Sequence, residues 1–456
     1  MGAKLCNILH QQHHTETDAI NQCFDVSEPW ARPCLLDTRH QLVRDIQKEM
    51  RIAAGAQKMF RASKGKKAKT QVKELRNSSE KRVKALYSSL LKLNAEIARR
   101  EAESTQGLPG RGAIRGDPKH SLQFSSFSAR DFRRIKVLGR GSYGKVLLVE
   151  YLPANIYCAL KVLKKDEIYS LEEIQRILAE KEIGQVVNPD NFIVDLYATF
   201  TTKYHLFFVL EFVAGGSLRT HLKICGHFDL ERAKFYAACI VLGLEAIHMK
   251  DVVHRDLKPG NLLMDKDGYL KIADFGLGKT GIGYGGRTNS MVGSPAYMAP
   301  EVVGKKEYTR AVDWWALGVI TYEMLLGKRP FDGHNSCLCE YIEEAEPYFP
   351  ESLEPVAVSF ISELLNKNPE ERLGSTEGDA ADVAEHPFFN NIVWDDILER
   401  KATAPFIPSL DGPEDVTYFE EDFTKLPADL TLPKGPSAEM EIPIEEAFQD
   451  FTYSAF

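Results

Sequence analysis

The sequence lacks the features of a membrane-spanning, secreted or metal-cluster protein. No apolar run reaches the roughly 18 residues that a membrane-spanning helix needs, and no secretory signal is visible. The eight cysteines, at positions 6, 23, 34, 158, 225, 239, 337 and 339, show neither metal-ligand nor disulfide spacing. We therefore expect a cytoplasmic protein in a reducing compartment, and no nucleic-acid partner.

The composition sets the scale and the charge of the chain. Its 456 residues, 44% hydrophobic and 27% charged, suffice for one large globular domain and one smaller module. The net charge of −8 conceals an asymmetry. Residues 35–103 carry 18 Lys and Arg against 8 Asp and Glu, whereas residues 409–456 carry 2 against 12. The two regions are expected to face different partners.

The most informative stretch reads HRDLKPGN at 254–261 and is followed by DFG at 274–276. This combination resembles the catalytic loop and the metal-binding loop of protein kinases. The resemblance implies transfer of a phosphoryl group from ATP. That chemistry asks the protein for positioning and charge compensation, because negative charge spreads over the phosphoryl oxygens.

Each catalytic-loop residue has an expected role in this family. Asp256 would accept the proton of the substrate hydroxyl, and Lys258 would steady the transferring phosphate. Asn261 and Asp274 would bind two Mg²⁺ ions through oxygen ligands. The resemblance therefore implies ATP and Mg²⁺ as cofactors and protein substrates as partners.

A glycine-rich loop precedes these motifs and reads LGRGSYGKV at 138–146. Its glycines let backbone amides close over the ATP phosphates. Alone it is equally compatible with a dinucleotide fingerprint or an ordinary turn, but CALK follows at 158–161 with the expected spacing. Lys161 is then the phosphate-binding lysine, and Glu180 on the next predicted helix is its expected partner. The alternative for Glu180 is a solvated helix charge.

The expected site combines these motifs with a hinge in which Leu210 is the gatekeeper. The predicted ATP-binding residues are Leu138, Gly139, Gly141, Ser142, Gly144, Val146, Ala159, Lys161, Leu210, Glu211, Val213, Asn261 and Asp274. The predicted catalytic residues are Lys161, Glu180, Asp256 and Lys258. Their joint presence argues against a pseudokinase. Glu301 and Arg372, in the APE and NPEERLG motifs, are expected to form a buried structural pair.

The acidic end of the chain resembles the carboxy-terminal tail of AGC-group kinases. The matching segments are HPFF at 386–389, PFIP at 405–408, DVTYF at 415–419 and FQDFTY at 448–453. In that group the tail wraps back over the small lobe and places an aromatic residue near ATP. Phe448 and Phe451 would dock in a hydrophobic pocket beside the helix of Glu180. The alternative is a disordered acidic tail.

The amino-terminal region carries a heptad seam. Apolar residues recur at alternating three- and four-residue spacing at Val72, Leu75, Val83, Leu86, Leu90, Leu93 and Ile97. A second stripe in 35–60 and a turn at 63–66 predict an antiparallel hairpin. Residues 42–52 resemble the Rho-effector repeat of protein kinase N; a generic hairpin or a dimerising coil are the alternatives. The basic surface would suit an acidic GTPase or an anionic membrane.

The predicted fold class is α+β, with a bilobal protein kinase fold and an AGC tail preceded by an antiparallel α-helical coiled-coil hairpin. The expected segments are an amino-terminal tail at 1–34, the Rho-effector repeat at 35–103, a flexible linker at 104–126, the kinase domain at 127–389 and the AGC tail at 390–456. Over 127–456 the chain is similar to protein kinase N and protein kinase C. The resemblance implies a serine/threonine protein kinase acting downstream of Rho-type GTPases. A GTPase-binding scaffold is the alternative.

Regulation is predicted from hydroxyl placement. Ser290 aligns with the activation-loop site of an upstream kinase, and Thr431 and Thr452 align with two tail sites. The basic residues expected to receive a phosphate on the activation loop are Arg255, Lys279 and Arg176. The MGAKLC start resembles an N-myristoylation signal with cysteine where Ser or Thr is preferred, so recruitment to membranes stays open.

Substrate preference is predicted from the acids expected around the cleft. Basophilic relatives use carboxylates to bind Arg or Lys ahead of the target hydroxyl. Ser217 and Gly260 stand where two of these acids are expected, and Glu323 remains. We therefore expect phosphorylation of Ser and Thr with a weaker basic requirement than is usual in the group.

Overall fold

The structure is a computed structural model that describes residues 127–141, 144–187, 190–332, 338–430 and 444–455, together with five separate residues of the amino-terminal region. The chain divides into two compact units, Met1–Leu122 and Gln123–Phe456. The five described residues of the first unit, Lys69, Thr70, Lys73, Ser78 and Arg82, are helical. The predicted hairpin otherwise lies outside the described residues, as do the predicted linker and amino-terminal tail.

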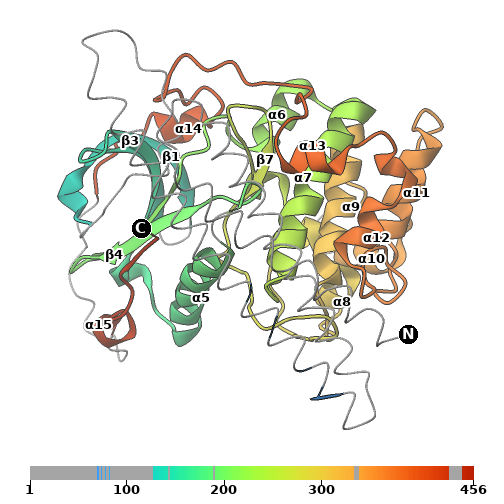
Figure 1. Ribbon diagram of the computed structural model, residues 1–456, viewed down its shortest axis with the longest axis horizontal. Coiled ribbons are helices and arrows are strands. Elements are labelled where there is room, and N and C mark those ends of the chain that lie inside the picture. The colour runs from blue at the N-terminus through green and yellow to red at the C-terminus, as the bar shows by residue number, and fades with distance from the viewer. Residues whose placement is uncertain are drawn as a thin grey trace, which may run out of the picture. The chain divides into compact units, whose positions relative to one another are not determined.

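The smaller lobe of the second unit is built on an antiparallel sheet (Figure 1). Its order is β1-β2-β3-β5-β4-β8. The strands are β1 (Phe132–Gly141), β2 (Gly144–Tyr151), β3 (Ile156–Lys164), β4 (Leu196–Thr201), β5 (His205–Glu211) and β8 (Tyr453–Ser454). The residues from His205 to Val209 are buried, and β5 lies between β3 and β4. The sixth strand, β8, comes from the end of the chain and pairs with β4.

One long helix, α5 (Leu171–Val187), packs against this sheet. It begins with a capping box, in which Ser170 and Glu173 exchange bonds between side chain and backbone. Its buried residues include Ile174, Ile177 and Glu180, which recur every three residues and therefore share one face. The cap and the spacing together place Glu180 on the side of the helix that faces the sheet.

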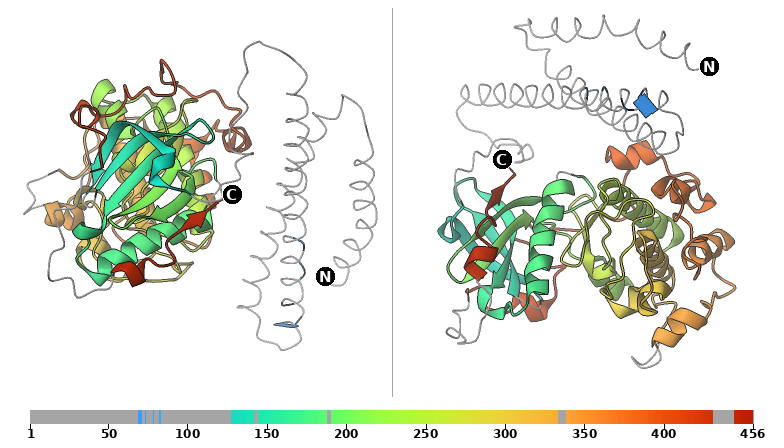
Figure 2. Two further views of the ribbon diagram at one scale, coloured as in Figure 1. Left: turned by 90° about the vertical axis from the view of Figure 1, so that its left-hand side faces the viewer. Right: turned by 90° about the horizontal axis from the view of Figure 1, so that it is seen from below.

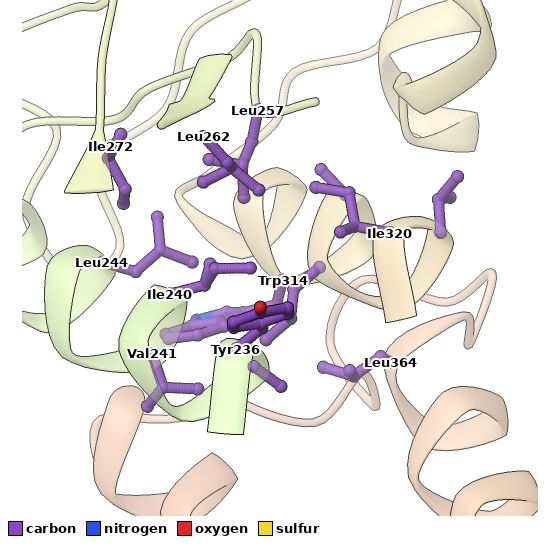
Figure 3. Close-up of a cluster of buried hydrophobic side chains, with 14 of the residues drawn as sticks. Tyr236, Ile240, Val241, Leu244, Leu257, Leu262, Ile272, Trp314, Ile320 and Leu364 are labelled. Atoms are coloured by element: carbon purple, nitrogen blue, oxygen red, sulfur yellow. The ribbon is translucent and has the colours of Figure 1, made fainter. Parts of the chain in front are cut away.

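The larger lobe is helical, with α7 and α9 at its centre (Figure 1). Its helices are α6 (Leu218–Cys225), α7 (Leu230–His248), α8 (Pro300–Val303), α9 (Ala311–Leu326), α10 (Leu338–Glu344), α11 (Pro355–Leu364), α12 (Ala380–Ala384) and α13 (Trp394–Leu398). Two short strands, β6 (Leu262–Met264) and β7 (Leu270–Ile272), form a separate hairpin. Tyr236 of α7, Trp314 of α9 and Leu364 of α11 meet in the core (Figure 3). Among the described residues no helix is long and apolar enough to cross a bilayer.

Short helical turns complete the path of the chain. The 3₁₀ turns are η2 (Ala129–Asp131), η3 (Lys165–Glu167), η4 (Pro259–Asn261), η5 (Pro295–Tyr297) and η6 (Pro387–Phe389). The tail carries α14 (Glu421–Thr424) and α15 (Ile444–Ala447). A lobe of antiparallel sheet and a lobe of helices agree with the predicted bilobal α+β fold.

The end of the tail returns to the sheet beside α5, where α15 and β8 are drawn in red (Figure 2). Phe448 and Phe451 are fully buried in one cluster with residues of α5 and β5. The Phe451 ring meets Phe208 edge-on at 5.3 Å, and the Thr199 hydroxyl donates to the Phe451 carbonyl. The predicted docking of the two phenylalanines is confirmed.

Candidate active site

A cleft of about 770 Å³ is lined by residues of both lobes. The predicted ATP-binding residues that line it are Leu138, Gly139, Gly141, Gly144, Val146, Ala159, Lys161, Leu210, Glu211, Val213, Asn261 and Asp274. Glu180, Asp256 and Lys258 line it as well. The structure therefore brings these residues to one place, although they come from six separate stretches of sequence. Ser142 lies outside the described residues.

The glycine-rich loop joins β1 to β2, and its last glycine is required by space. A Cβ atom on Gly144 would lie 1.7 Å from the carbonyl oxygen of Val162 on β3. Such a distance is far inside van der Waals contact, so any side chain here would push β2 away from β3. Gly144 therefore fixes how closely the loop approaches the strand that carries Lys161.

Lys161 lies in the part of the cleft that the smaller lobe forms, and two carboxylates bind it. Its Nζ lies 2.6 Å from Glu180 Oε1 and 3.0 Å from Asp274 Oδ1. The Lys161 ammonium holds the pKa of Asp274 at about 2, so this carboxylate stays ionised. Burial opposes the charge of Lys161, but the two carboxylates outweigh it and raise the pKa of the lysine. One cation thus links α5, β3 and the DFG loop.

Asp256 sits at the centre of the lower cleft. Its Oδ2 accepts from Lys258 Nζ at 2.6 Å, and its Oδ1 accepts from the Ser294 hydroxyl at 2.8 Å. Lys258 also donates to Ser294 Oγ at 2.8 Å. The carboxylate, the ammonium and the hydroxyl form a closed triangle. The Ser294 hydroxyl donates to Asp256 and accepts from Lys258, so an alcohol fits between these two side chains.

The backbone of the catalytic loop is held from below by Asp313 of α9. Its carboxylate accepts from the amides of His254 and Arg255, each at 2.9 Å. Arg255 has a φ of +67°, a conformation that is uncommon for a residue with a side chain. The bonds to the buried carboxylate help to hold that conformation and so fix the position of Asp256.

Two oxygen ligands suit the magnesium that the fold family implies. The Asn261 side-chain nitrogen donates to the Asp256 carbonyl at 2.9 Å, so the amide oxygen of Asn261 is the atom left to act as a ligand. Asp274 uses Oδ1 for Lys161 and keeps its second carboxylate oxygen. Mg²⁺ prefers a few protein oxygens together with water and substrate phosphates. The described residues contain no cluster of three or more His, Cys, Asp or Glu that could hold a metal ion.

The hinge end of the cleft is apolar. Leu138, Leu148 and Ala159 form one cluster to which Leu210 and Phe419 also belong. Phe212 stacks on Phe419 of the tail with a centroid distance of 5.9 Å. These flat apolar walls suit an aromatic base. The Glu211 carboxylate does not face this ligand space freely, because it binds Lys271 at 2.7 Å.

The structure gathers two of the three predicted phosphate-receiving cations around Ser290. Arg255 Nη1 donates to Ser290 Oγ at 2.7 Å. Lys279 Nζ donates to Thr288 Oγ1 at 2.9 Å, and Thr288 Oγ1 lies 3.5 Å from Ser290 Oγ. Arg176 instead binds Glu172, its neighbour four residues back on α5, at 2.5 Å.

The two predicted tail phosphorylation sites differ in what can be described. Thr431 lies outside the described residues, and Thr452 is exposed directly after the buried Phe451. Lys181 of α5 donates to the carbonyl of Asp450, two residues before Thr452. A cation therefore lies close to the backbone of this segment.

The predicted structural pair of Glu301 and Arg372 is confirmed. Arg372 donates from Nη1 and Nη2 to the two carboxylate oxygens of Glu301 at 2.7 and 2.9 Å. It also donates to the carbonyls of Asn366 and Ala311. This pair anchors the end of the activation segment to the large lobe.

Several cleft residues were missed from the sequence. Glu420 and Phe423 of the tail, and Arg140 and Arg219 of the two lobes, also line the cleft. Arg140 could have been found because it lies inside the glycine-rich loop. The other three belong to no motif, and only the folding of the tail and of α6 brings them there.

Comparison with known proteins agrees with this geometry. The family described as "Protein kinase domain" matches residues 132–389, and the one described as "Protein kinase C terminal domain" matches residues 410–453. The chain is 44% identical over 332 residues to serine/threonine-protein kinase N2 of Danio rerio, which covers 72% of this chain and 34% of that protein.

Two further relatives show the same partial coverage. Serine/threonine-protein kinase N3 of Mus musculus is 44% identical over 330 residues, covering 71% of this chain and 37% of that protein. Protein kinase C-like 1 of Saccharomyces cerevisiae is 40% identical over 339 residues, covering 74% and 29%. The chain thus spans about a third of the length of these relatives. Because the kinase-domain match extends over more than half of the sequence, the chain belongs to the protein kinase family and carries the carboxy-terminal tail of its AGC group.

Proposed function

We propose that the protein is a serine/threonine protein kinase that transfers the γ-phosphoryl group of ATP to protein hydroxyls. The observation that carries this proposal is the charge arrangement of the cleft. Lys161 is shared by Glu180 and Asp274, and Asp256 with Lys258 lies across the same cavity. Lysine side chains and a carboxylate that can accept a proton are thus fixed around a cavity, one end of which is apolar and suits an adenine ring.

In this proposal each residue acts by position. Lys161, held by Glu180, binds the phosphates of ATP, and Asp256 orients the substrate hydroxyl and accepts its proton. Lys258 compensates the negative charge that spreads over the transferring phosphoryl oxygens. Asn261 and Asp274 hold Mg²⁺, which supplies further charge compensation when bound. The apolar walls exclude water from the adenine end.

The test is transfer of labelled phosphate from ATP to a Ser/Thr peptide by the full chain. Asp274→Ala removes a metal ligand, and we expect it to abolish transfer. Asp267→Ala is the matched control, because Asp267 is exposed and lies outside the cleft. Equal transfer by Asp274→Ala and wild type would contradict the proposal, and so would its absence in the wild type. The second outcome would favour the scaffold function.

We further propose that phosphorylation of Ser290 by an upstream kinase raises activity. Arg255 already donates to the Ser290 hydroxyl. Lys279 donates to the Thr288 hydroxyl, which lies next to that of Ser290. A phosphate adds a charge of about −1.5 to −2, so a cation that now bonds to a neutral hydroxyl would face an ionised acceptor. We expect Ser290→Ala to lower activity severalfold while Ser352→Ala, at an exposed site, leaves it unchanged. Wild-type activity in Ser290→Ala would contradict the idea.

The amino-terminal region is proposed to bind a Rho-type GTPase, with the protein located in the cytoplasm and recruited to membranes through this partner. Support comes from the sequence, since residues 35–103 combine a heptad seam with 18 basic against 8 acidic residues. A pull-down with GTP- and GDP-loaded Rho proteins tests the proposal. Binding that prefers the GTP form is expected, and no retention of either form would contradict it.

A further inference from the structure

Every acidic side chain that lines the cleft among the described residues is paired with a lysine. Each of the five carboxylates found there among the described residues is bonded to a lysine. The pairs are Glu180 and Asp274 with Lys161, Glu211 with Lys271, Asp256 with Lys258, and Glu420 with Lys223, at 2.6 to 3.0 Å. A positively charged substrate side chain would therefore find no unpaired acid in this cavity.

The basic side chains of the cleft are balanced less completely. Arg176 binds Glu172, and Lys145 donates only to uncharged backbone carbonyls of the tail. Arg140 and Arg219 make no ion pair or side-chain hydrogen bond with any residue that the structure describes. The cavity thus has an excess of positive charge, located at the glycine-rich loop and at the start of α6.

Arg219 belongs to the large-lobe part of the cleft lining, at the start of α6. It follows the N-cap Ser217 on the first turn of α6, and its charge acts on Tyr297 and Glu323. Tyr297 is three residues after Ser294, whose hydroxyl occupies Asp256. Arg219 lines the same cleft as Asp256, Lys258 and Ser294.

Glu323, the one acid that the sequence left for a basic substrate residue, is already in use. The Tyr297 hydroxyl donates to its Oε2 at 2.7 Å. Burial raises the pKa of Glu323, while Tyr297 and the guanidinium groups of Arg329 and Arg219 favour its ionised form. Glu323 is thus bonded to a neighbouring hydroxyl and already acted on by two guanidinium groups.

We propose that Arg219 makes this cleft select substrates with an acidic side chain ahead of the target Ser or Thr, in place of the basic side chain expected for the group. The acidic group is a carboxylate or a phosphate already present on the substrate. This inference rests on the proposed kinase function and names its substrate class. It goes beyond a weakened basic preference, because the preference reverses in sign.

The experiment uses one serine peptide in four forms, with Asp, phosphoserine, Ala or Arg at the positions ahead of the acceptor. Two quantities are measured on the full chain: kcat/KM for phosphoryl transfer, and Kd of each fluorescent peptide by anisotropy. Wild type is compared with Arg219→Glu, Arg219→Met and Lys250→Glu. Lys250 is exposed and is not part of the cleft lining, so Lys250→Glu is a matched charge reversal.

We expect the wild type to prefer the Asp or phosphoserine peptide over the Arg peptide in both quantities. Arg219→Glu should shift that ratio by about tenfold toward Arg, because one attraction becomes a repulsion and one repulsion an attraction. Arg219→Met should shift it by less, and Lys250→Glu should leave it unchanged. The preference should shrink as salt is raised. A larger gain from phosphoserine than from Asp would identify phosphate as the group recognised.

The proposal is overturned if the wild type prefers the Arg peptide, or if Arg219→Glu and Arg219→Met keep the wild-type ratio. Failure to fold is separated by thermal melting, and Arg219→Met retains the apolar stem of the arginine. If no peptide is phosphorylated, the proposed kinase function fails. The anisotropy ratios then still decide whether the cleft selects acidic peptides.

Discussion

Two of the glutamate–cation pairs, one in each lobe, differ in their surroundings. Lys161 and Glu180 keep 19% and 10% of their side-chain surface exposed, and the lysine divides its charge between Glu180 and Asp274. Arg372 and Glu301 keep 0% and 4%, and two parallel bonds join them. The first pair is open to a ligand and its lysine is shared by two carboxylates, whereas the second pair is closed.

This difference separates function from folding. An arginine fork matches a carboxylate in a fixed geometry, while a lysine on a flexible stem can turn to a third group. Burial makes the second pair costly to break on one side, because the remaining charge has no water to turn to. Removing one partner of the first pair leaves groups that the cleft can hydrate. The same chemistry therefore supports activity in one lobe and stability in the other.

The largest expected effect comes from breaking the closed pair. Arg372→Met leaves Glu301 buried without its partner, and we expect the free energy of unfolding to fall by about 3 to 5 kcal/mol. Urea denaturation followed by circular dichroism measures this. Arg287→Met is the control, since Arg287 is exposed and its ion pair with Glu370 is long, at 3.8 Å. For this variant we expect the free energy of unfolding to fall by about 0 to 1 kcal/mol. Equal losses in the two variants would end the distinction between the pairs.

Breaking the open pair should change activity and leave folding nearly intact. Lys161→Met removes the phosphate-binding cation, and we expect phosphoryl transfer to fall by about 10² to 10³-fold. The urea midpoint should stay near that of the wild type. Lys164→Met, on the same strand with its cation paired to Glu167 near the surface, is the control for both measurements. Strong destabilisation by Lys161→Met would contradict a functional role for the open pair.

Both pairs could be predicted from the sequence, because each joins two motifs whose spacing and order are specific. Lys161 in CALK and Glu180 on an amphipathic helix came from their positions, as did Arg372 and Glu301. The bilobal fold and the docking of Phe451 came from the same kind of pattern. These predictions succeeded because recognising a motif also indicates which residue of another motif its side chain binds.

Other contacts could not be predicted, because they depend on local geometry that no motif encodes. Arg176 was expected to receive a phosphate, but Glu172 is four residues away on the same helix face and binds it. The neutralisation of Glu211 by Lys271 joins a hinge to a short hairpin 60 positions later in the chain. Such pairs follow from the packed structure, and so does the surplus charge of Arg219.

The tail sharpens the comparison because it packs beside the helix that carries the open pair. Phe451 lies against Phe208 and under Lys181 of α5. We expect Phe451→Ala to lower the free energy of unfolding by about 1.5 to 3 kcal/mol through lost burial, and to lower activity because α5 loses support. Thermal melting and peptide phosphorylation measure the two effects. Tyr348→Ala, at an exposed aromatic, should change neither; unchanged activity in Phe451→Ala would separate the tail from the cleft.

The smallest expected effect is that of pH on the free energy of unfolding, and it acts through a buried histidine in the large lobe, the lobe of the closed pair. His248 is buried between Asp313 and Asp379, with nitrogen–oxygen distances of 3.0 and 3.1 Å. Burial opposes its charge, but Asp379 and Asp313 prevail and raise the pKa of His248 from 6.5 to about 9. The folded state thus binds the proton more tightly than the unfolded state. The resulting stability is fully present below pH 6.5 and is lost as the pH rises through about 9.

We therefore expect the free energy of unfolding to fall between pH 6.5 and 9, with a slope of up to about 1.4 kcal/mol per pH unit from this group. Urea titrations at several pH values measure the slope. His248→Gln should flatten it, whereas His227→Gln, at an exposed histidine, should leave it as in wild type. An unchanged slope in His248→Gln would contradict the charge assignment. Asp313 binds His248 and also accepts from the amides of His254 and Arg255. We therefore expect loss of the His248 proton to weaken the support of the catalytic loop.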